Sequence, residues 1–292
     1  MDLDLLRALD ALAQHGTMTA AAAALHVSQP TLHGQLARLS GSLGVALYRR
    51  AGRGIELTPD GVRALAFARD VEQRLTALRN ELGGSAEKQP VILAAGHGAF
   101  LHLLGPALRA FHARGSAPLR LLTRTGAEAI DALRRGEAHL AVAAGPTEPD
   151  DLASDVLSRV GAAVLVPRRH PLARKRSVRL RDLHGERLIV PPPGAPHREA
   201  LARALEAQGV HWESAVEAQG WELFAHFARL GLGLAVVNDF VRAPPGLYAR
   251  PLRELTPVTY RLLRRRGSAL SEAAESLRVL LTAQTPRRGR ER

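Results

Sequence analysis

The sequence predicts two domains joined by a long helix: an N-terminal, mostly α-helical unit of the winged helix-turn-helix type, and a C-terminal α/β domain of two lobes. The chain has 292 residues, more than one ordinary core accommodates. Leucine and alanine recur at helical spacing in its first part, and short apolar runs alternate with helical segments in its second. We place the boundaries at residues 1–58, at 59–84 for the helix and at 90–292 for the α/β domain.

Composition excludes several classes of protein. Hydrophobic residues make up 46% of the chain, but no apolar run approaches the roughly 20 residues that a membrane helix needs, so we expect no membrane partner. Acidic residues stand near the N-terminus, where a secretory signal carries Lys or Arg, which favours the cytoplasm. The chain has no cysteine, which excludes a disulfide framework and Cys-based metal sites.

The formal net charge of +12 does not by itself indicate nucleic-acid binding. Residues 1–58 hold five arginines and four acidic residues, a balance of +1, whereas residues 249–292 hold eleven arginines and four glutamates, a balance of +7. Only two of the 40 cationic side chains are lysine, so the surplus of positive charge is typical of a genome-wide preference for arginine. A prediction of DNA binding therefore depends on where individual arginines stand.

The first 43 residues have the pattern of three helices. Apolar residues recur at helical spacing up to a stop at Gly16, and Thr17 or Thr19 is suited to cap a short alanine-rich second helix. Ser28 is suited to cap a third helix, where Pro30 falls in the tolerated first turn. The apolar stripe of this helix is Leu32, Leu36, Leu39 and Leu43, and its other side displays Thr31, His33, Gly34 and Arg38. Two short helices, a tight turn and a third helix indicate a helix-turn-helix.

A β-hairpin is predicted after the third helix. Residues 47–50 and 55–58 have strand composition, and a glycine-rich turn separates them. As a wing, this hairpin would carry arginines to phosphates beside the groove that the third helix occupies. For Arg38 a solvated surface charge is the alternative. The predicted DNA-contacting residues are Ser28, Gln29, Pro30, Thr31, His33, Gly34, Arg38, Arg49, Arg50 and Arg53.

A long helix is predicted from Pro59 to Leu82. Thr58, Pro59 and Asp60 have the composition of a helix start. Apolar residues then follow at alternating steps of four and three, which is a heptad seam. Such a seam favours pairing with a second copy of the chain, and packing on the chain's own body is the alternative. The predicted dimerisation residues are Ala64, Ala68, Val71, Leu75, Leu78 and Leu82.

The first 65 residues resemble the LysR-type transcriptional regulators. The resemblance rests on residues 25–30 (LHVSQP), 43–50 (LGVALYRR) and 57–61 (LTPDG). The sequence departs from the family pattern at His33 and Gly34, where a Ser-Arg pair is usual. The resemblance implies a ligand-responsive transcription regulator that binds promoter or operator DNA as a homodimer or homotetramer.

The remaining residues alternate between strand and helix patterns, which indicates parallel strands. We expect lobe 1 to comprise about 90–161 and 262–292, and lobe 2 about 162–261. The predicted strands are 91–95, 119–123, 139–143, 162–166, 188–191, 212–217 and 234–237. The predicted helices are 101–114, 127–135, 197–208 and 221–229.

The family resemblance extends into this domain through residues 170–173 (HPLA), 180–183 and 231–233 (GLG). It implies a two-lobed domain similar to periplasmic solute-binding proteins, with a small-molecule site between the lobes. Ligands of open α/β sheets bind where loops leave the carboxyl ends of strands, often at helix N-termini that favour anions. We therefore expect a small, anionic co-inducer. The predicted effector-binding residues are His97, Gly98, Thr125, His197 and Trp221, of which Trp221 has lobe core as its alternative.

The sequence contains no motif of a hydrolase nucleophile, a phosphate-binding loop or a zinc protease. His97 and His102 are five residues apart, a poor spacing for metal ligands on one helix face. We therefore expect no enzymatic activity, no catalytic residue, no metal and no cofactor. A transport solute-binding protein is the other alternative, but it would have no use for the first 85 residues.

Overall fold

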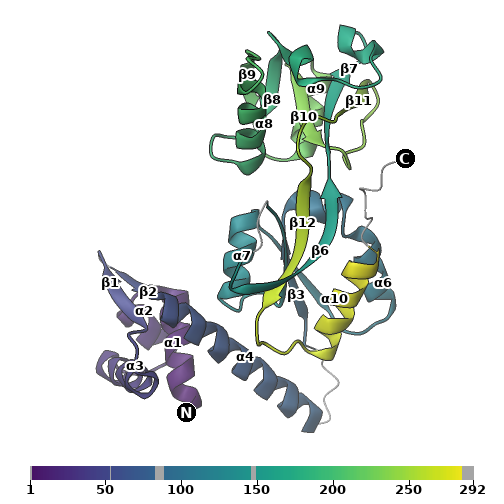
Figure 1. Cartoon of the computed structure of the whole chain (residues 1–292). Coiled ribbons are helices and arrows are strands. Elements are labelled where there is room, and N and C mark those ends of the chain that lie inside the picture. Colours follow the sequence, from purple (N-terminus) through teal and green to yellow (C-terminus); the bar gives the residue numbers. More distant parts are fainter. Residues whose placement is uncertain (1, 53, 83–88, 146–148, 285–292) are drawn as a thin grey trace.

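The computed structural model describes residues 2–52, 54–82, 89–145 and 149–284. A helical N-terminal unit with a small hairpin is followed by one long helix and by a two-lobed α/β domain (Figure 1). Among the described helices, none combines the length and the apolar character needed to span a lipid bilayer.

The N-terminal unit has the predicted three helices and hairpin. Its elements are α1 (Leu3–His15), α2 (Met18–Ala24), α3 (Gln29–Leu43), β1 (Tyr48–Ala51) and β2 (Gly54–Leu57). Of the two candidate caps for α2, Thr17 accepts the backbone N–H of Ala20 at 3.3 Å. Gly16 and Gly44 end α1 and α3 in the left-handed conformation, which glycine adopts without steric cost.

The long helix α4 (Pro59–Leu82) is fixed to the wing at its first turn. The Thr58 hydroxyl accepts the N–H of Gly61 at 3.0 Å and donates to the carbonyl of Ala46 at 2.6 Å. A Cβ at Gly61 would lie 1.8 Å from the Leu47 carbonyl oxygen, so only glycine allows this approach. The direction in which α4 leaves the N-terminal unit is therefore set by the backbone itself.

The α/β domain contains two five-stranded sheets, one in each lobe. The lobe 1 sheet has the order β4-β3-β5-β12-β6, in which β3, β4 and β5 are parallel and β12 is antiparallel to both of its neighbours, β5 and β6. The lobe 1 elements are β3 (Val91–Ala95), α5 (His97–His102), α6 (Gly105–Ala113), β4 (Leu119–Thr123), α7 (Gly126–Arg134), β5 (Leu140–Ala144), β6 (Leu152–Val160), β12 (Val258–Arg265) and α10 (Glu272–Gln284).

The lobe 2 sheet has the order β11-β7-β10-β8-β9, with β8, β9 and β10 parallel and β7 antiparallel to both of its neighbours. The lobe 2 elements are β7 (Ala162–Pro167), η1 (Pro171–Arg174), η2 (Leu180–Leu183), β8 (Arg187–Val190), α8 (Pro196–Glu206), β9 (Glu213–Glu217), α9 (Trp221–Arg229), β10 (Leu234–Asn238) and β11 (Leu247–Leu252). Two long strands, β6 and β12, run from the lobe 1 sheet toward lobe 2 (Figure 1).

The structure differs from the sequence prediction in several details. The chain returns to lobe 1 with β12, which begins at Val258, a few residues before the approximate boundary of 262. The helix predicted over 101–114 is two helices, and Pro106 in the first turn of α6 explains the break, because proline has no N–H to continue α5. Strands β6, β11 and β12 and the last helix, α10, are not among the predicted elements. Strands β6 and β11 carry mixed apolar and polar side chains without a simple alternation.

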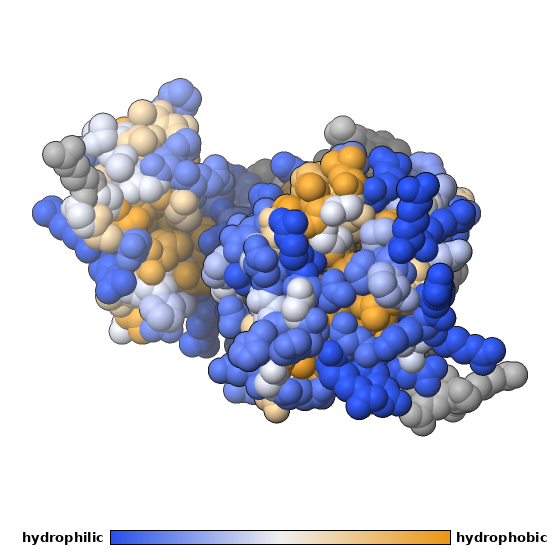
Figure 2. Space-filling view, turned by 90° about the horizontal axis from the view of Figure 1, so that it is seen from above, coloured by the Kyte–Doolittle hydropathy of each residue, from blue (hydrophilic) through white to orange (hydrophobic). Residues whose placement is uncertain are grey.

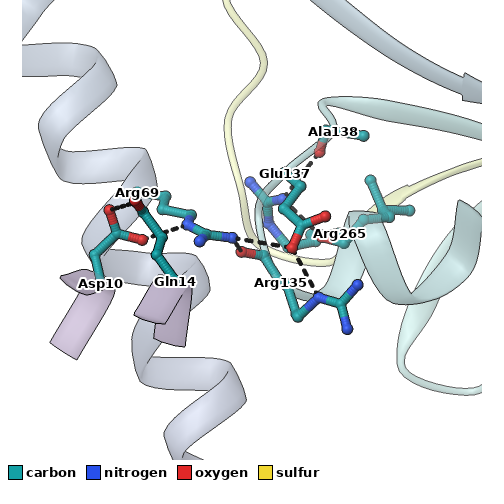
Figure 3. A network of polar contacts seen from close by, with 8 residues as sticks. Asp10, Gln14, Arg69, Arg135, Glu137, Ala138 and Arg265 are labelled. Carbon is teal, nitrogen blue, oxygen red and sulfur yellow. Dashed lines mark hydrogen bonds and ion pairs between the residues drawn. The ribbon is translucent and has the colours of Figure 1, made fainter. Parts of the chain in front are cut away.

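Arg69 of α4 connects the N-terminal unit with lobe 1 (Figure 3). Its guanidinium lies 2.7 Å from the Asp10 carboxylate of α1 and donates at 2.7 Å to the carbonyl oxygen of Arg135, in the turn after α7. Glu137 from the same turn lies 3.6 Å away. The Arg69 side chain is only 18% exposed, so these contacts are partly shielded from water and stronger than a surface pair.

A second contact lies one residue further along α4. Asp70 pairs with Arg265 at the end of β12 and accepts the Ser268 hydroxyl at 2.6 Å. Gly136 packs closely against the same helix, since a Cβ there would lie 3.2 Å from the Cα of Ala66. The middle of α4 is therefore held by lobe 1 while its start is held by the winged unit.

Candidate nucleic-acid interface and interlobe site

Helix α3 presents a polar face to solvent above a buried apolar stripe. Leu32, Leu36 and Leu39 are fully buried in the core of the N-terminal unit, whereas Leu43, predicted to belong to the same stripe, is 39% exposed. The exposed residues at the start and along the outer side of the helix are Ser28, Gln29, Pro30, Thr31, His33, Gly34 and Arg38. A polar, solvent-facing helix of this kind fits the major groove of duplex DNA.

The start of α3 is ordered by Ser28. Its hydroxyl accepts the N–H of Thr31 at 3.2 Å, and the two side-chain oxygens lie 2.7 Å apart. Further along the helix, no atom lies within 4 Å of the place where a Cβ of Gly34 would stand. Packing within the chain therefore does not require a glycine at this exposed position.

The wing carries two described arginines on β1. The Arg49 guanidinium lies 3.1 Å from the Glu56 carboxylate on β2, and the two side chains are 72% and 58% exposed. A solvated pair of this kind contributes little stability, so Arg49 can exchange Glu56 for a phosphate at small cost. Arg50 is also exposed, whereas Arg53, the third predicted contact, lies outside the described residues.

The predicted seam of α4 divides into two halves. Ala68 is 4% exposed and belongs to the core of the N-terminal unit, and Ala64 and Val71 pack against that core. This half of the seam therefore packs on the chain's own N-terminal unit, which was the alternative prediction. Leu78 and Leu82 are 48% and 79% exposed and remain available to a partner helix.

Residues from both lobes meet between α5 and α9. The Trp221 indole lies so close to Gly98 that a Cβ there would stand 2.8 Å from its ring nitrogen. The Trp221 and His197 rings meet edge to face with centroids 4.9 Å apart. His197 donates from Nε2 to the Val236 carbonyl at 3.1 Å, and burial lowers its pKa, which favours the neutral form of the imidazole.

Glu222, the neighbour of Trp221 on α9, holds two histidines of α5 across the lobe junction. One carboxylate oxygen lies 3.4 Å from Nδ1 of His97 and the other lies 3.0 Å from Nε2 of His102. The predicted residue His97 is therefore part of the junction, together with Gly98, His197 and Trp221. Glu222 and His102 were not predicted as site residues, because no pattern in a single sequence indicates a contact between residues 120 positions apart.

Thr125, the fifth predicted residue, has a local role. Its hydroxyl accepts the N–H of Glu128 at 3.3 Å, and the Glu128 carboxylate accepts the N–H of Thr125 at 2.8 Å. These two bonds form a capping box at the start of α7. Neither of these side-chain bonds links Thr125 to the four residues at the lobe junction.

A cavity of about 320 Å³ opens beside the C-terminal end of α5. Its walls combine apolar side chains with two basic ones, His102 and Arg242, and with the buried Ser158. The His102 ring stacks on the ring of Phe240, another wall residue, with centroids 5.2 Å apart. Among the described residues, no group of three His, Cys, Asp or Glu side chains is arranged to hold a metal ion.

A winged helix-turn-helix joined through one helix to a two-lobed α/β domain defines the class of one-chain DNA-binding regulators with a sensory domain. Two family models match the chain: "Bacterial regulatory helix-turn-helix protein, lysR family" over residues 3–62, and "LysR substrate binding domain" over residues 85–286. The chain belongs to the LysR family of transcription regulators.

Some relatives and solved structures resemble this chain over nearly its whole length. The RuBisCO operon transcriptional regulator of Allochromatium vinosum is 26% identical over 290 residues, covering 97% of this chain and 96% of the relative. A full-length OxyR structure from Pseudomonas aeruginosa superposes with a TM-score of 0.72 at 26% identity, covering 97% of this chain and 95% of that one. ArgP from Mycobacterium tuberculosis, at 16% identity, shares the fold with a TM-score of 0.74 and covers 98% of this chain and 99% of its own.

Proposed function

We propose that this chain regulates transcription by binding operator DNA as a homo-oligomer whose DNA affinity or geometry responds to a small molecule. Helix α3 enters the major groove, and Arg49 and Arg50 of the wing contact the neighbouring phosphates. The observation that carries this proposal is the exposed polar face of α3 beside a basic hairpin, on the same chain as a two-lobed sensory domain.

We place the contact between two copies on the exposed half of α4. Leu78 and Leu82 stand at a heptad step of four and are largely in water in the single chain. Leu75, three residues earlier, completes the seam. Phe67, three turns before Leu78 and close to the same helix face, is 52% exposed, and burial of such an aromatic side chain would add to the stability of a dimer.

We place the small molecule in the cavity beside α5, and we propose that it carries a carboxylate. The volume of this cavity reaches the lower end of ligand pockets in general. His102 and Arg242 can both donate to a carboxylate there. Glu222 already presents one carboxylate to His102, so a carboxylate ligand would replace the chain's own acid.

The displacement of Glu222 by a ligand would couple ligand binding to DNA binding. Glu222 and Trp221 belong to lobe 2, whereas His97 and His102 belong to lobe 1, so a ligand that frees Glu222 changes the contact between the lobes. Lobe 1 is attached to α4 and, through Arg69, to α1 of the DNA-binding unit. A ligand that binds one lobe arrangement better than the other therefore shifts the position of the paired recognition helices.

The DNA-binding part of the proposal is tested by selecting duplexes from a random library with the purified full-length chain. We expect one preferred sequence with two related half-sites, bound by an oligomer. A protein that is monomeric, and that binds the selected duplex no better than a scrambled one at moderate ionic strength, would contradict the proposal.

The ligand part is tested by a thermal-shift screen of small carboxylates, amines and neutral compounds. We expect carboxylates to raise the melting temperature of the native chain, and Arg242→Gln to reduce that rise. Glu222→Gln, which removes the competing charge, should increase the apparent affinity for the same compounds, whereas the exposed control Glu213→Gln should not. Stabilisation by neutral or cationic compounds alone would rule out the carboxylate.

A further inference from the structure

Lobe 2 carries a dense run of arginines that the proposed function does not use. The segment 168–181 contains seven cationic side chains and no acidic one, and all seven are exposed. One of them, Lys175, is paired with Asp182 at 2.6 Å. The other six, here called the lobe 2 arginine cluster, are Arg168, Arg169, Arg174, Arg176, Arg179 and Arg181.

The backbone beneath the lobe 2 arginine cluster is firmly held. Leu172 and Leu180, from the short helices η1 and η2, are 7% and 2% exposed in the core of lobe 2. The N–H of Val178 donates to the Pro251 carbonyl at 3.0 Å, and the Arg250 guanidinium donates to the Ala173 carbonyl at 2.6 Å. Apolar side chains therefore point inward and cationic ones outward, so the charges form a preorganised surface and not a mobile tail.

The arginines of this cluster are also free to bind an anion. Within the described parts of the chain, none of the six guanidinium groups forms an ion pair with a carboxylate, and the nearby Asp182 is bound by Lys175 and by the backbone N–H of Arg179. Arg168 lies over the Tyr248 ring, 5.6 Å from its centroid, which leaves the guanidinium edge open. Six like charges on one short segment repel one another, and a bound polyanion would relieve that repulsion.

The chemistry of this surface favours a phosphate backbone over a protein partner. Protein interfaces depend on buried aromatic or aliphatic side chains at their centre, but the large exposed apolar side chains found among the described residues include none from 168–181. Figure 2, which looks down on lobe 2, shows mostly hydrophilic side chains on this face, with hydrophobic ones confined to smaller patches. Guanidinium groups, in contrast, match the geometry of phosphate oxygens.

The location of the cluster determines which DNA it would meet. Lobe 2 lies at the end of the chain opposite the winged unit, with α4 and lobe 1 between them (Figure 1). The base pairs that α3 and the wing of the same chain would hold therefore lie at a different part of the molecule from the cluster. We propose that the lobe 2 arginine cluster binds the phosphates of a second stretch of duplex DNA, without regard to its sequence.

The test uses the full chain with the first DNA site disabled by Arg38→Ala, Arg49→Ala and Arg50→Ala. The proposed function predicts that this triple variant no longer binds the operator. The further inference predicts that the same protein still binds a scrambled duplex at low salt, measured by fluorescence anisotropy. Adding Arg169→Gln, Arg174→Gln and Arg176→Gln should then weaken the residual binding at least about tenfold and flatten its log–log salt dependence by about 3, because each lost phosphate contact removes a slope of about 0.9.

A matched control removes the same charge elsewhere. Arg109→Gln, Arg120→Gln and Arg203→Gln alter three exposed arginines on α6, β4 and α8, and these changes should leave the residual binding nearly unchanged. Equal losses in both triple variants would show that net charge alone holds the DNA and would overturn the proposal. The proposal would also be overturned if the variant with the first DNA site disabled bound no duplex. Binding of a polyglutamate peptide through the cluster, in place of DNA, would overturn it as well.

Discussion

The substitution Gly136→Ala should weaken the contact between lobe 1 and helix α4. Gly136 has a φ of +70°, and alanine in that region costs about 1–2 kcal/mol. Its methyl would also stand 3.2 Å from the Cα of Ala66 and 3.3 Å from the Cβ of Arg69, so the turn has to move away from α4. That movement lengthens the bond from Arg69 to the Arg135 carbonyl, a charged hydrogen bond worth about 1.5–3 kcal/mol when buried. Because the Arg69 side chain is partly exposed, we expect Gly136→Ala to lower the free energy of unfolding by about 3 kcal/mol in total.

Gly185→Ala is the matched control. Gly185 has a φ of +73°, but nothing lies within 4 Å of the position of its Cβ, so only the backbone cost of about 1 kcal/mol remains. In scanning calorimetry, the difference of about 2 kcal/mol should place the effector-domain transition of Gly136→Ala about 4–8 °C below that of the control. Equal melting temperatures would refute the reasoning, because they would show that the turn is not pressed against α4.

Three further predictions concern the DNA interface and the pH dependence of stability. Arg49→Ala with Arg50→Ala should weaken binding to all duplexes alike and flatten the log–log salt dependence by about 2; a loss confined to one operator would contradict a phosphate role. Gly34→Ala should alter base preference or specific affinity, since nothing in the chain would meet the added methyl and DNA would; unchanged binding would exclude close approach to a base. Burial lowers the pKa of His139 from 6.5 to about 4. The unfolded chain therefore takes up a proton first as pH falls, and the free energy of unfolding should decrease between pH 6.5 and 4. His139→Asn should flatten that decrease in denaturant titrations, and an unaltered pH profile would count against a buried, neutral imidazole.

Local sequence signals were sufficient for the N-terminal unit. The cap at Ser28, the stop at Gly16 and the helix start at Pro59 each depend on bonds between neighbours in sequence, and the structure shows all three. In the α/β domain, the continuous apolar runs of β3 and β10 predict buried strands. The irregular pattern of β6 and the proline within β11 do not, because their strand conformation comes from pairing with β12 and β7.

The interlobe residues could be predicted only in part. His97, His197 and Trp221 follow strands at the edge where ligands of α/β domains bind, and that rule identifies them. Glu222 stands next to Trp221 in the first turn of α9 but faces α5 of the other lobe, a contact between residues far apart in sequence. Likewise, the heptad steps of α4 are the same for Ala68 and Leu82, and only the packing of the folded chain distinguishes the buried half from the exposed half.

Methylation interference on the selected operator tests most directly whether α3 reads DNA. Methyl groups at guanine N7 lie in the major groove, so we expect them to block binding in two clusters related by a dyad, one for each paired chain. The Thr31→Val variant should change which positions within each cluster matter. Interference restricted to the minor groove, or spread evenly along the duplex, would contradict a recognition role for the exposed face of α3.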